Sequence, residues 1–172
     1  MADQTLAGLT NQAIRVRGRT FTQEFPETAT QTFKAGDLVK IDSAGRINIA
    51  ATAGNTLVST GENLVGQAQE AASGTTDNMI AVTVFTEDTI ITLPVYHATP
   101  ASAVTAATNL DVLYALINET TGGWMVDIGT TTNGILLGLR NAKSYDGASM
   151  AVGDDYGPMD CKVVTAGRFY QS

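Results

Sequence analysis

The sequence predicts an all-β protein, folded as a compact β-barrel or small sandwich, and three observations support this. Only 16% of the residues are charged, and Thr, Ala, Gly, Asn and Ser supply much of the polarity. That composition suits pleated strands and tight turns better than solvated helices. Several short segments alternate apolar and polar residues, which is the period of a half-buried strand. A strand–turn–strand pattern also occurs twice, which indicates one supersecondary unit used twice.

Residues 1–31 are polar and weakly patterned, and we expect them to form an extended N-terminal arm. Arg15, Arg17 and Arg19 stand at alternate positions within this segment and are three of the ten basic residues. The alternation fits an edge strand with one solvated, charged face, and arginine on such an edge discourages unwanted strand pairing. The alternative is an arm that lies on an acidic neighbour, with these three arginines as the contact.

Strand signals become regular from residue 33. Segments 37–42 and 46–49 flank a short turn in which Asp42 can hydrogen-bond the turn backbone. Gly45 can take the positive φ that a three-residue hairpin with a bulge requires. Further strands are expected at 64–68, 80–84 and 91–95.

The second half of the chain repeats this order of motifs. Asp111 follows Asp37 by 74 residues, and Gly138 follows Gly66 by 72 residues. Met159 corresponds to Met79 only if an insertion around residues 143–156 is allowed. The sequence therefore predicts a β-domain at 32–172 with an internal duplication, about 33–96 and 107–172. Each unit has one apolar face and cannot stand alone in water, so the two units should close against each other. Segment 98–107 is the best helical candidate, although Pro100 weakens it.

Charge and cysteine content exclude several classes of protein. The net charge of −7 should repel nucleic acid and anionic membranes. A single cysteine, Cys161, excludes an intramolecular disulfide and a cysteine-based metal cluster. The sequence contains no apolar run of membrane-spanning length, and residues 1–11 carry no secretory signal. We expect a protein that is made and assembled in a cytoplasm.

No residue pattern predicts catalysis, a cofactor or a metal site, so we expect a protein that is not an enzyme. His97 is the one histidine and follows a predicted strand, as a turn histidine would. Alternation places Cys161 on a buried face, where it acts as a small hydrophobe. The acidic cluster at 154–160 lacks the ligand spacing of a calcium loop. Dispersed carboxylates, as in a small hydrolase, stay an alternative because a fold can bring them together from anywhere.

Two aromatic residues are candidates for buried or partner contacts. Trp124 begins an alternating strand and is expected in the core. Phe85 falls on the face opposite Ile80, Val82 and Val84. We therefore predict that Phe85 makes a half-buried contact with another subunit.

Taken in order, these motifs resemble those of tailed-phage capsid decoration, or cement, proteins. The resemblance covers about residues 33–139. It is carried by AGDLV at 35–39, SAGRI at 43–47, LVGQA at 64–68, TLPV at 92–95, LDVLY at 110–114 and LLG at 136–138.

The resemblance implies a virion protein that binds the outside of the expanded capsid, usually as a homotrimer, and bridges subunits of the major capsid protein. The alternative is a carbohydrate-binding or adhesin-type β module on a virion or bacterial surface.

Overall fold

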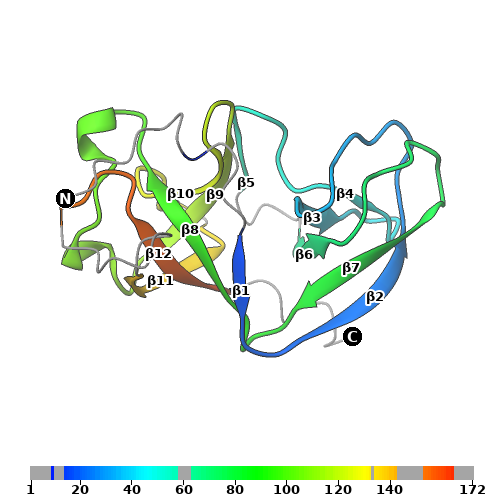
Figure 1. Cartoon of the computed structure of the whole chain (residues 1–172), viewed down its shortest axis with the longest axis horizontal. Helices are drawn as coiled ribbons and strands as arrows, with labels where there is room; N and C mark the ends of the chain where they lie inside the picture. The colour runs from blue at the N-terminus through cyan, green and yellow to red at the C-terminus, as the bar shows by residue number, and fades with distance from the viewer. Residues whose placement is uncertain (1–8, 10–13, 58–62, 133, 143–152, 165–172) are drawn as a thin grey trace.

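The computed structural model describes residues 9, 14–57, 63–132, 134–142 and 153–164, and it confirms the all-β fold class (Figure 1). Within these ranges the chain forms strands and short 3-10 helices but no α-helix. The expected helical segment 98–107 contains only η2 (Pro100–Ser102) and the first residue of η3 (Ala107–Asn109). The strands are β1 (Arg15–Arg17), β2 (Thr20–Pro26), β3 (Leu38–Ile41), β4 (Ile47–Ile49), β5 (Asn55–Leu57), β6 (Asn63–Ala68), β7 (Met79–Phe85), β8 (Ile90–Tyr96), β9 (Leu113–Glu119), β10 (Gly123–Asp127), β11 (Leu136–Asn141) and β12 (Pro158–Val163).

The seven-stranded sheet closes into a barrel formed by β8 to β12, here called the second barrel. Its strands follow one another in the order β8-β10-β9-β11-β12, and β12 then pairs with β8 to complete the ring. The β8–β10 pair is parallel and the other pairs of the ring are antiparallel. β1 and β5, which come from the first half of the chain, extend this sheet by pairing with β8 and β9.

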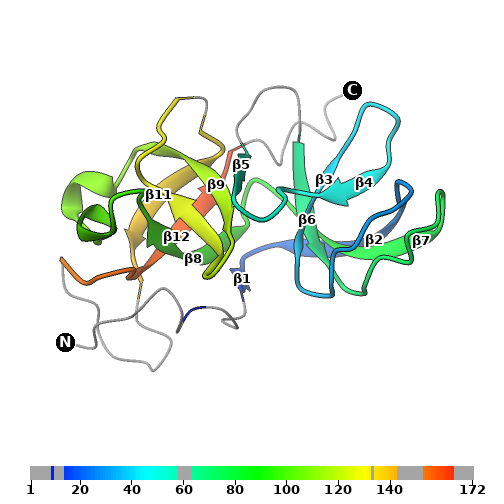
Figure 2. The same cartoon turned by 90° about the horizontal axis from the view of Figure 1, so that it is seen from above.

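The five-stranded sheet forms the first barrel, in the order β2-β7-β6-β3-β4. A parallel bridge between Glu27, just after β2, and Ile47, in β4, joins the two ends of this order. The Thr28 amide donates to the Ile47 carbonyl at 3.1 Å at the same junction. Figure 2 shows the two barrels side by side.

The two barrels have the same strand order. Starting from its first strand, the first barrel runs β2-β7-β6-β3-β4 and the second runs β8-β12-β11-β9-β10. The repeating structural segments are thus 20–85 and 90–163, which differ from the sequence-based segments 33–96 and 107–172. β8, expected at the end of the first unit, opens the second barrel, because strand partners are chosen across the fold and not by proximity in sequence.

Residues 15–26 do not form an extended arm, and this expectation was wrong for them. β2 pairs with β7 along its whole length, from Thr20 opposite Phe85 to Pro26 opposite Met79. Its burial explains the error: of its seven residues only Phe25 is buried, so no apolar stripe marks it as a strand. Residues 1–8 and 10–13 of the predicted arm lie outside the described ranges. A truncation through residue 31 would remove both β1 and β2.

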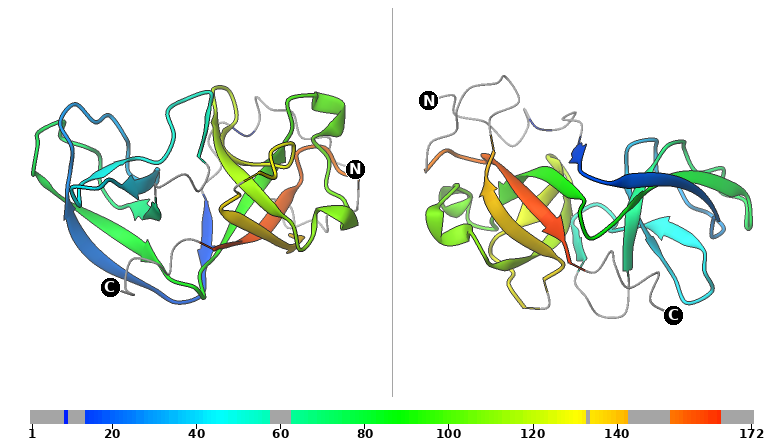
Figure 3. Two further views of the ribbon diagram at one scale, coloured as in Figure 1. Left: turned by 180° about the vertical axis from the view of Figure 1, so that it is seen from behind. Right: turned by 90° about the horizontal axis from the view of Figure 1, so that it is seen from below.

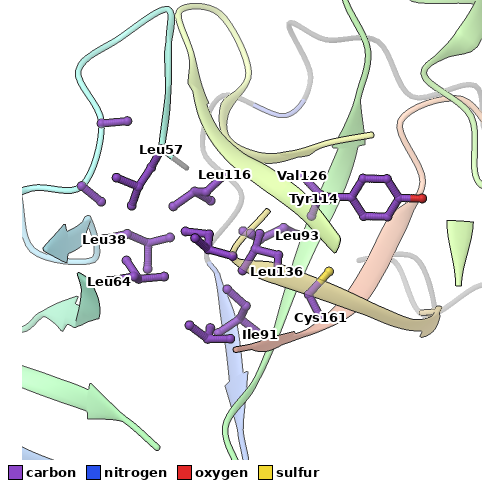
Figure 4. Close-up of a cluster of buried hydrophobic side chains, with 14 of the residues drawn as sticks. Leu38, Leu57, Leu64, Ile91, Leu93, Tyr114, Leu116, Val126, Leu136 and Cys161 are labelled. Carbon is purple, nitrogen blue, oxygen red and sulfur yellow. The ribbon is translucent and has the colours of Figure 1, made fainter. Parts of the chain in front are cut away.

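Three strands of the first barrel carry buried apolar side chains on both faces, and those on the outer faces pack against the second barrel. Val39, Val65 and Val84 point into the core of the first barrel. Their neighbours Leu38, Leu64 and Phe85 belong instead to a cluster with residues of the second barrel. Figure 4 shows Leu38 and Leu64 facing Leu116 and Leu136 in this cluster.

Phe85 therefore does not contact another subunit through an exposed face, and that prediction was wrong. Its side chain is 1% exposed. The strand alternation did place it opposite the core of its own barrel, but the surface that covers it is the second barrel of the same chain.

A second connection between the barrels is formed by the two turns through which the chain passes from one barrel to the other. The turn between β1 and β2 passes the turn between β7 and β8, as Figure 3 shows. The Arg19 carbonyl accepts hydrogen bonds from the hydroxyls of Thr86 at 2.8 Å and Thr89 at 2.7 Å. Gly18 has φ +89°, and a Cβ at this position would lie 2.1 Å from the Asp88 carbonyl oxygen. Only glycine fits this crossing without a backbone shift.

We expect Phe85→Ala to lower the free energy of unfolding by about 3–5 kcal/mol, because it opens a cavity in the shared core. Phe21→Ala is the matched control, since Phe21 is 40% exposed, and should cost less than about 1 kcal/mol. Urea unfolding followed by tryptophan fluorescence and circular dichroism measures both. An equal loss in free energy of unfolding for the two variants would contradict the shared core.

Gly18→Ala should destabilise the protein more than Gly45→Ala. Both glycines have positive φ, but a Cβ at Gly45 meets no atom within 4 Å. The backbone strain is common to both, so the difference, about 1–3 kcal/mol, reports the clash with the Asp88 carbonyl. Thermal and urea unfolding of the two variants give this difference, and a value of zero would show that the crossing has room for a side chain.

Candidate functional site

A surface pocket of about 320 Å³ lies where β1, β8, β11 and β12 meet on the second barrel. Strand register brings its polar side chains together: Arg15 is opposite Thr92, Thr92 is opposite Asp160, and Asp160 is opposite Arg140. Strand neighbours of Thr92 and Asp160, such as Ile91 and Cys161, point into the apolar cluster instead. The pocket is lined by Arg15, Arg17, Thr92, Arg140, Asn141, Ala142 and Asp160, and is called here the arginine pocket.

Asp160 organises the arginine pocket. Its side chain is only 2% exposed. One carboxylate oxygen, Oδ1, accepts the Thr92 hydroxyl at 2.6 Å. The other, Oδ2, accepts the Arg140 Nε–H at 2.6 Å and forms an ion pair with the Arg17 guanidinium. A carboxylate with this many charge-assisted bonds is held in one orientation and fixes both arginines in turn.

The surroundings of Asp160 lower its pKa below the usual value of an aspartate side chain. Burial is the largest influence and on its own raises the pKa. Hydrogen bonds from Thr92, Arg140 and Arg17, together with the positive charge of Arg17, outweigh it. The carboxylate is therefore ionised at neutral pH.

The arginine pocket is basic on an acidic protein. The described part of its lining contains three guanidinium groups and one carboxylate, whereas the chain as a whole carries −7. The side chains of Arg17 and Arg140 are 45% and 64% exposed despite their contact with Asp160. Arginine presents its donors in a planar fork that matches carboxylate and phosphate oxygens. This arrangement can bind an anionic group.

The structure brings together two of the three arginines predicted as a contact. Arg15 and Arg17 line the pocket on the edge strand β1. Arg19 does not line it, and its backbone carbonyl is used in the crossing between the barrels. Arg15 and Arg17 line the same pocket, but only Arg17 is exposed. The alternation does not extend to Arg19, because the chain turns at Gly18.

Sequence reasoning missed Arg140, Asn141 and Asp160 as site residues. Asp160 carried a signal: it is a charged residue between Met159 and Cys161, both of which are fully buried. A carboxylate inside a buried strand needs a charged or hydrogen-bonding partner. The partners, Arg17 on β1 and Arg140 on β11, could not be identified without the strand register that brings both strands close to Asp160.

His97 and Cys161, which were considered for chemistry on sequence grounds, make the following contacts. The His97 ring accepts the Thr99 amide at Nδ1, at 2.9 Å. Cys161 is fully buried, and burial raises the pKa of its thiol well above the usual range. Among the described residues no group of three or more His, Cys, Asp or Glu side chains is arranged to hold a metal ion.

Trp124 lies between the barrels and is partly buried against the shared cluster. Its indole N–H donates to Asp37 Oδ1 of the first barrel at 3.0 Å. Asp37 also accepts the Lys34 amide at 2.7 Å, which fixes the turn before β3. The core position expected for Trp124 is thus an inter-barrel position with one polar contact.

No model of a known protein family matches this chain, and a search of curated proteins finds no match to its sequence. In the described part of the chain, no helix has the length and apolar character needed to cross a membrane. Function must therefore be inferred from the geometry and chemistry of the chain itself.

Asp160→Asn should lower the free energy of unfolding by about 2 kcal/mol at pH 7, because it removes charge-assisted hydrogen bonds from a buried position. The folded pKa is lowered, so the wild-type contribution is complete above about pH 4. It is lost as the pH falls through the folded value. The difference in free energy of unfolding between the variant and the wild type should therefore become smaller as the pH falls below about 4.

Urea unfolding from pH 7 to pH 3 measures this gap. Asp77→Asn is the control, because Asp77 is 61% exposed and pairs with Arg46 at the surface. Its effect should be much smaller. A gap for Asp160→Asn that stays constant across this pH range would show that the charge of Asp160 is not what stabilises the pocket.

Proposed function

We propose that this protein is a capsid decoration, or cement, protein that binds the outer surface of an expanded phage capsid and stabilises it. Its partner is the major capsid protein, and its location is the virion. The order of sequence motifs supports this proposal, as does a double barrel held together by one shared core. A protein that resists deformation of a shell needs a body that transmits force without opening between its parts.

The single observation that carries the proposal is the arginine pocket on an acidic protein. A decoration protein recognises a protein surface, and arginine is enriched at protein interfaces. The pocket lies on the face made by β1, β8, β11 and β12, so the strands that hold it are fixed by the closed second barrel. We place the shell contact there.

The proposed oligomer is a homotrimer. Capsid lattices contain local threefold positions, and a threefold oligomer presents three copies of one contact to three neighbouring capsid subunits. Three weak contacts made together bind far more tightly than one. Native mass spectrometry of the purified protein tests the oligomer directly, and a monomer at micromolar concentration would remove this part of the proposal.

The carbohydrate-binding alternative gains no support from the tryptophan. A sugar platform needs an exposed aromatic face, whereas Trp124 is partly buried between the barrels and bonded to Asp37.

The protein should co-sediment with expanded capsids, and Arg140→Gln should weaken that binding at least tenfold. A loss of about 1.4 kcal/mol at one contact is already tenfold, and the proposed trimer makes three contacts. Arg46→Gln is the matched control, since Arg46 pairs with Asp77 on the first barrel and should bind as the wild type does. Circular dichroism confirms that both variants fold. Failure of the wild-type protein to bind expanded capsids would refute the proposed function.

A further inference from the structure

We propose that the arginine pocket is a receptor for the carboxylate of an aspartate or glutamate side chain presented by a partner protein. The inference names the chemistry of the contact and rests on the proposed function only for the identity of the partner.

The geometry of the guanidinium groups favours a second carboxylate beside Asp160. A guanidinium has five N–H donors, and the bonds recorded to Asp160 use the Nε–H of Arg140 and an Nη2–H of Arg17. The two side chains remain 64% and 45% exposed, so their outer edges face solvent. Asp160 holds the two guanidinium groups at the pocket and reduces the entropy that a ligand must remove.

The charge balance of the pocket leaves it positive. Arg17 and Arg140 contribute two positive charges, and Asp160, which holds both of them, contributes one negative charge. One incoming carboxylate would neutralise this surplus without reversing it. A polyanion such as nucleic acid would instead bring many charges toward a protein of net charge −7, and long-range repulsion would oppose it.

The openness of the pocket favours a side chain on a protein surface over a free small molecule. Sites for small ligands enclose most of the ligand, whereas two of the three arginines here are about half exposed or more. Docking of a partner would bury these exposed guanidinium edges and so strengthen their bonds to the incoming carboxylate.

Asn141 adds a feature that suits a peptide. It lines the pocket, and its Oδ1 is buried with no hydrogen-bond partner among the described residues. A buried acceptor without a partner costs about 1–3 kcal/mol. After rotation of the amide, a peptide N–H could satisfy this acceptor, whereas a small dicarboxylate that is ionised at neutral pH offers no donor.

The experiment uses the full-length protein and two short peptides, acetyl-Gly-Glu-Glu-Gly-amide and its glutamine counterpart acetyl-Gly-Gln-Gln-Gly-amide. Binding is followed by NMR of the arginine Nε–Hε signals, assigned by single Arg→Gln variants. The glutamate peptide should shift the Arg17 and Arg140 signals and leave the Arg46 signal unmoved. Its affinity should fall as salt is added, and the glutamine peptide should cause no shift.

Variants separate the pocket from general surface charge. Arg17→Gln and Arg140→Gln should each weaken the glutamate peptide about three- to tenfold, and each retains the other arginine as a partner for Asp160. Arg46→Gln is the control and should not change the affinity. Equal binding of the two peptides, or equal loss with Arg46→Gln, would overturn the inference. The comparison of the two peptides on the wild-type protein decides the question even if a pocket variant does not fold.

Two further probes distinguish the source of the anion. Glutarate and inorganic phosphate should bind at least tenfold more weakly than the glutamate peptide. Phosphate or glutarate binding as tight as the peptide would show a small-anion site and overturn the assignment to a protein side chain. No capsid is present in these assays, so their failure would leave the proposed function standing, and failure of capsid binding would leave a carboxylate site intact.

Discussion

The contact between the two barrels is the interaction on which the rest of this structure depends. Each barrel is a closed ring of five strands, and a ring of this size encloses few side chains. Strands β3, β6 and β7 compensate because each carries a buried apolar side chain on its outer face as well: Leu38, Leu64 and Phe85 pack against the second barrel. Small domains bury a low fraction of their surface, and the shared cluster makes one larger hydrophobic core from two marginal ones. Pairing of β1 with β8 and of β5 with β9 adds backbone hydrogen bonds across the same boundary.

The arginine pocket is a consequence of that contact. β1 supplies Arg15 and Arg17 to the second barrel, yet it continues through Gly18 into β2, the first strand of the first barrel. The Arg19 carbonyl is held there by two threonine hydroxyls from the turn between β7 and β8. The strand that supplies two of the pocket's arginines is therefore also part of the connection between the barrels. The lining of the pocket itself comes from strands of the seven-stranded sheet.

Local signals in the sequence predicted much of the fold, and non-local pairing accounts for most errors. The turn after Asp42 follows the expected chemistry: its Oδ1 accepts the amides of Ala44 and Arg46, and Gly45 has φ +79°. These bonds form within a few residues, so the sequence alone predicts them. The sequence did not predict the pairing of β2, because most of its side chains are exposed. It assigned Phe85 to an outer face but could not predict which surface covers that face. For the same reason the sequence predicted only part of the pocket. Arg15 and Arg17 alternate along one strand, whereas Arg140 and Asp160 join them only through sheet register.

Asp160 contributes both to the stability of the second barrel and to the geometry of the proposed binding site. A buried ion pair is a weak source of stability, because removing the charges from water costs nearly as much as their attraction returns. An apolar residue between Met159 and Cys161 would leave the buried Thr92 hydroxyl without its acceptor. It would also leave Arg17 and Arg140 free to turn into solvent. The carboxylate instead holds both guanidinium groups against the barrel while more than two fifths of each side chain stays exposed. Its specific effect is orientation, and two oriented guanidinium groups with exposed edges form a surface that a second carboxylate can recognise.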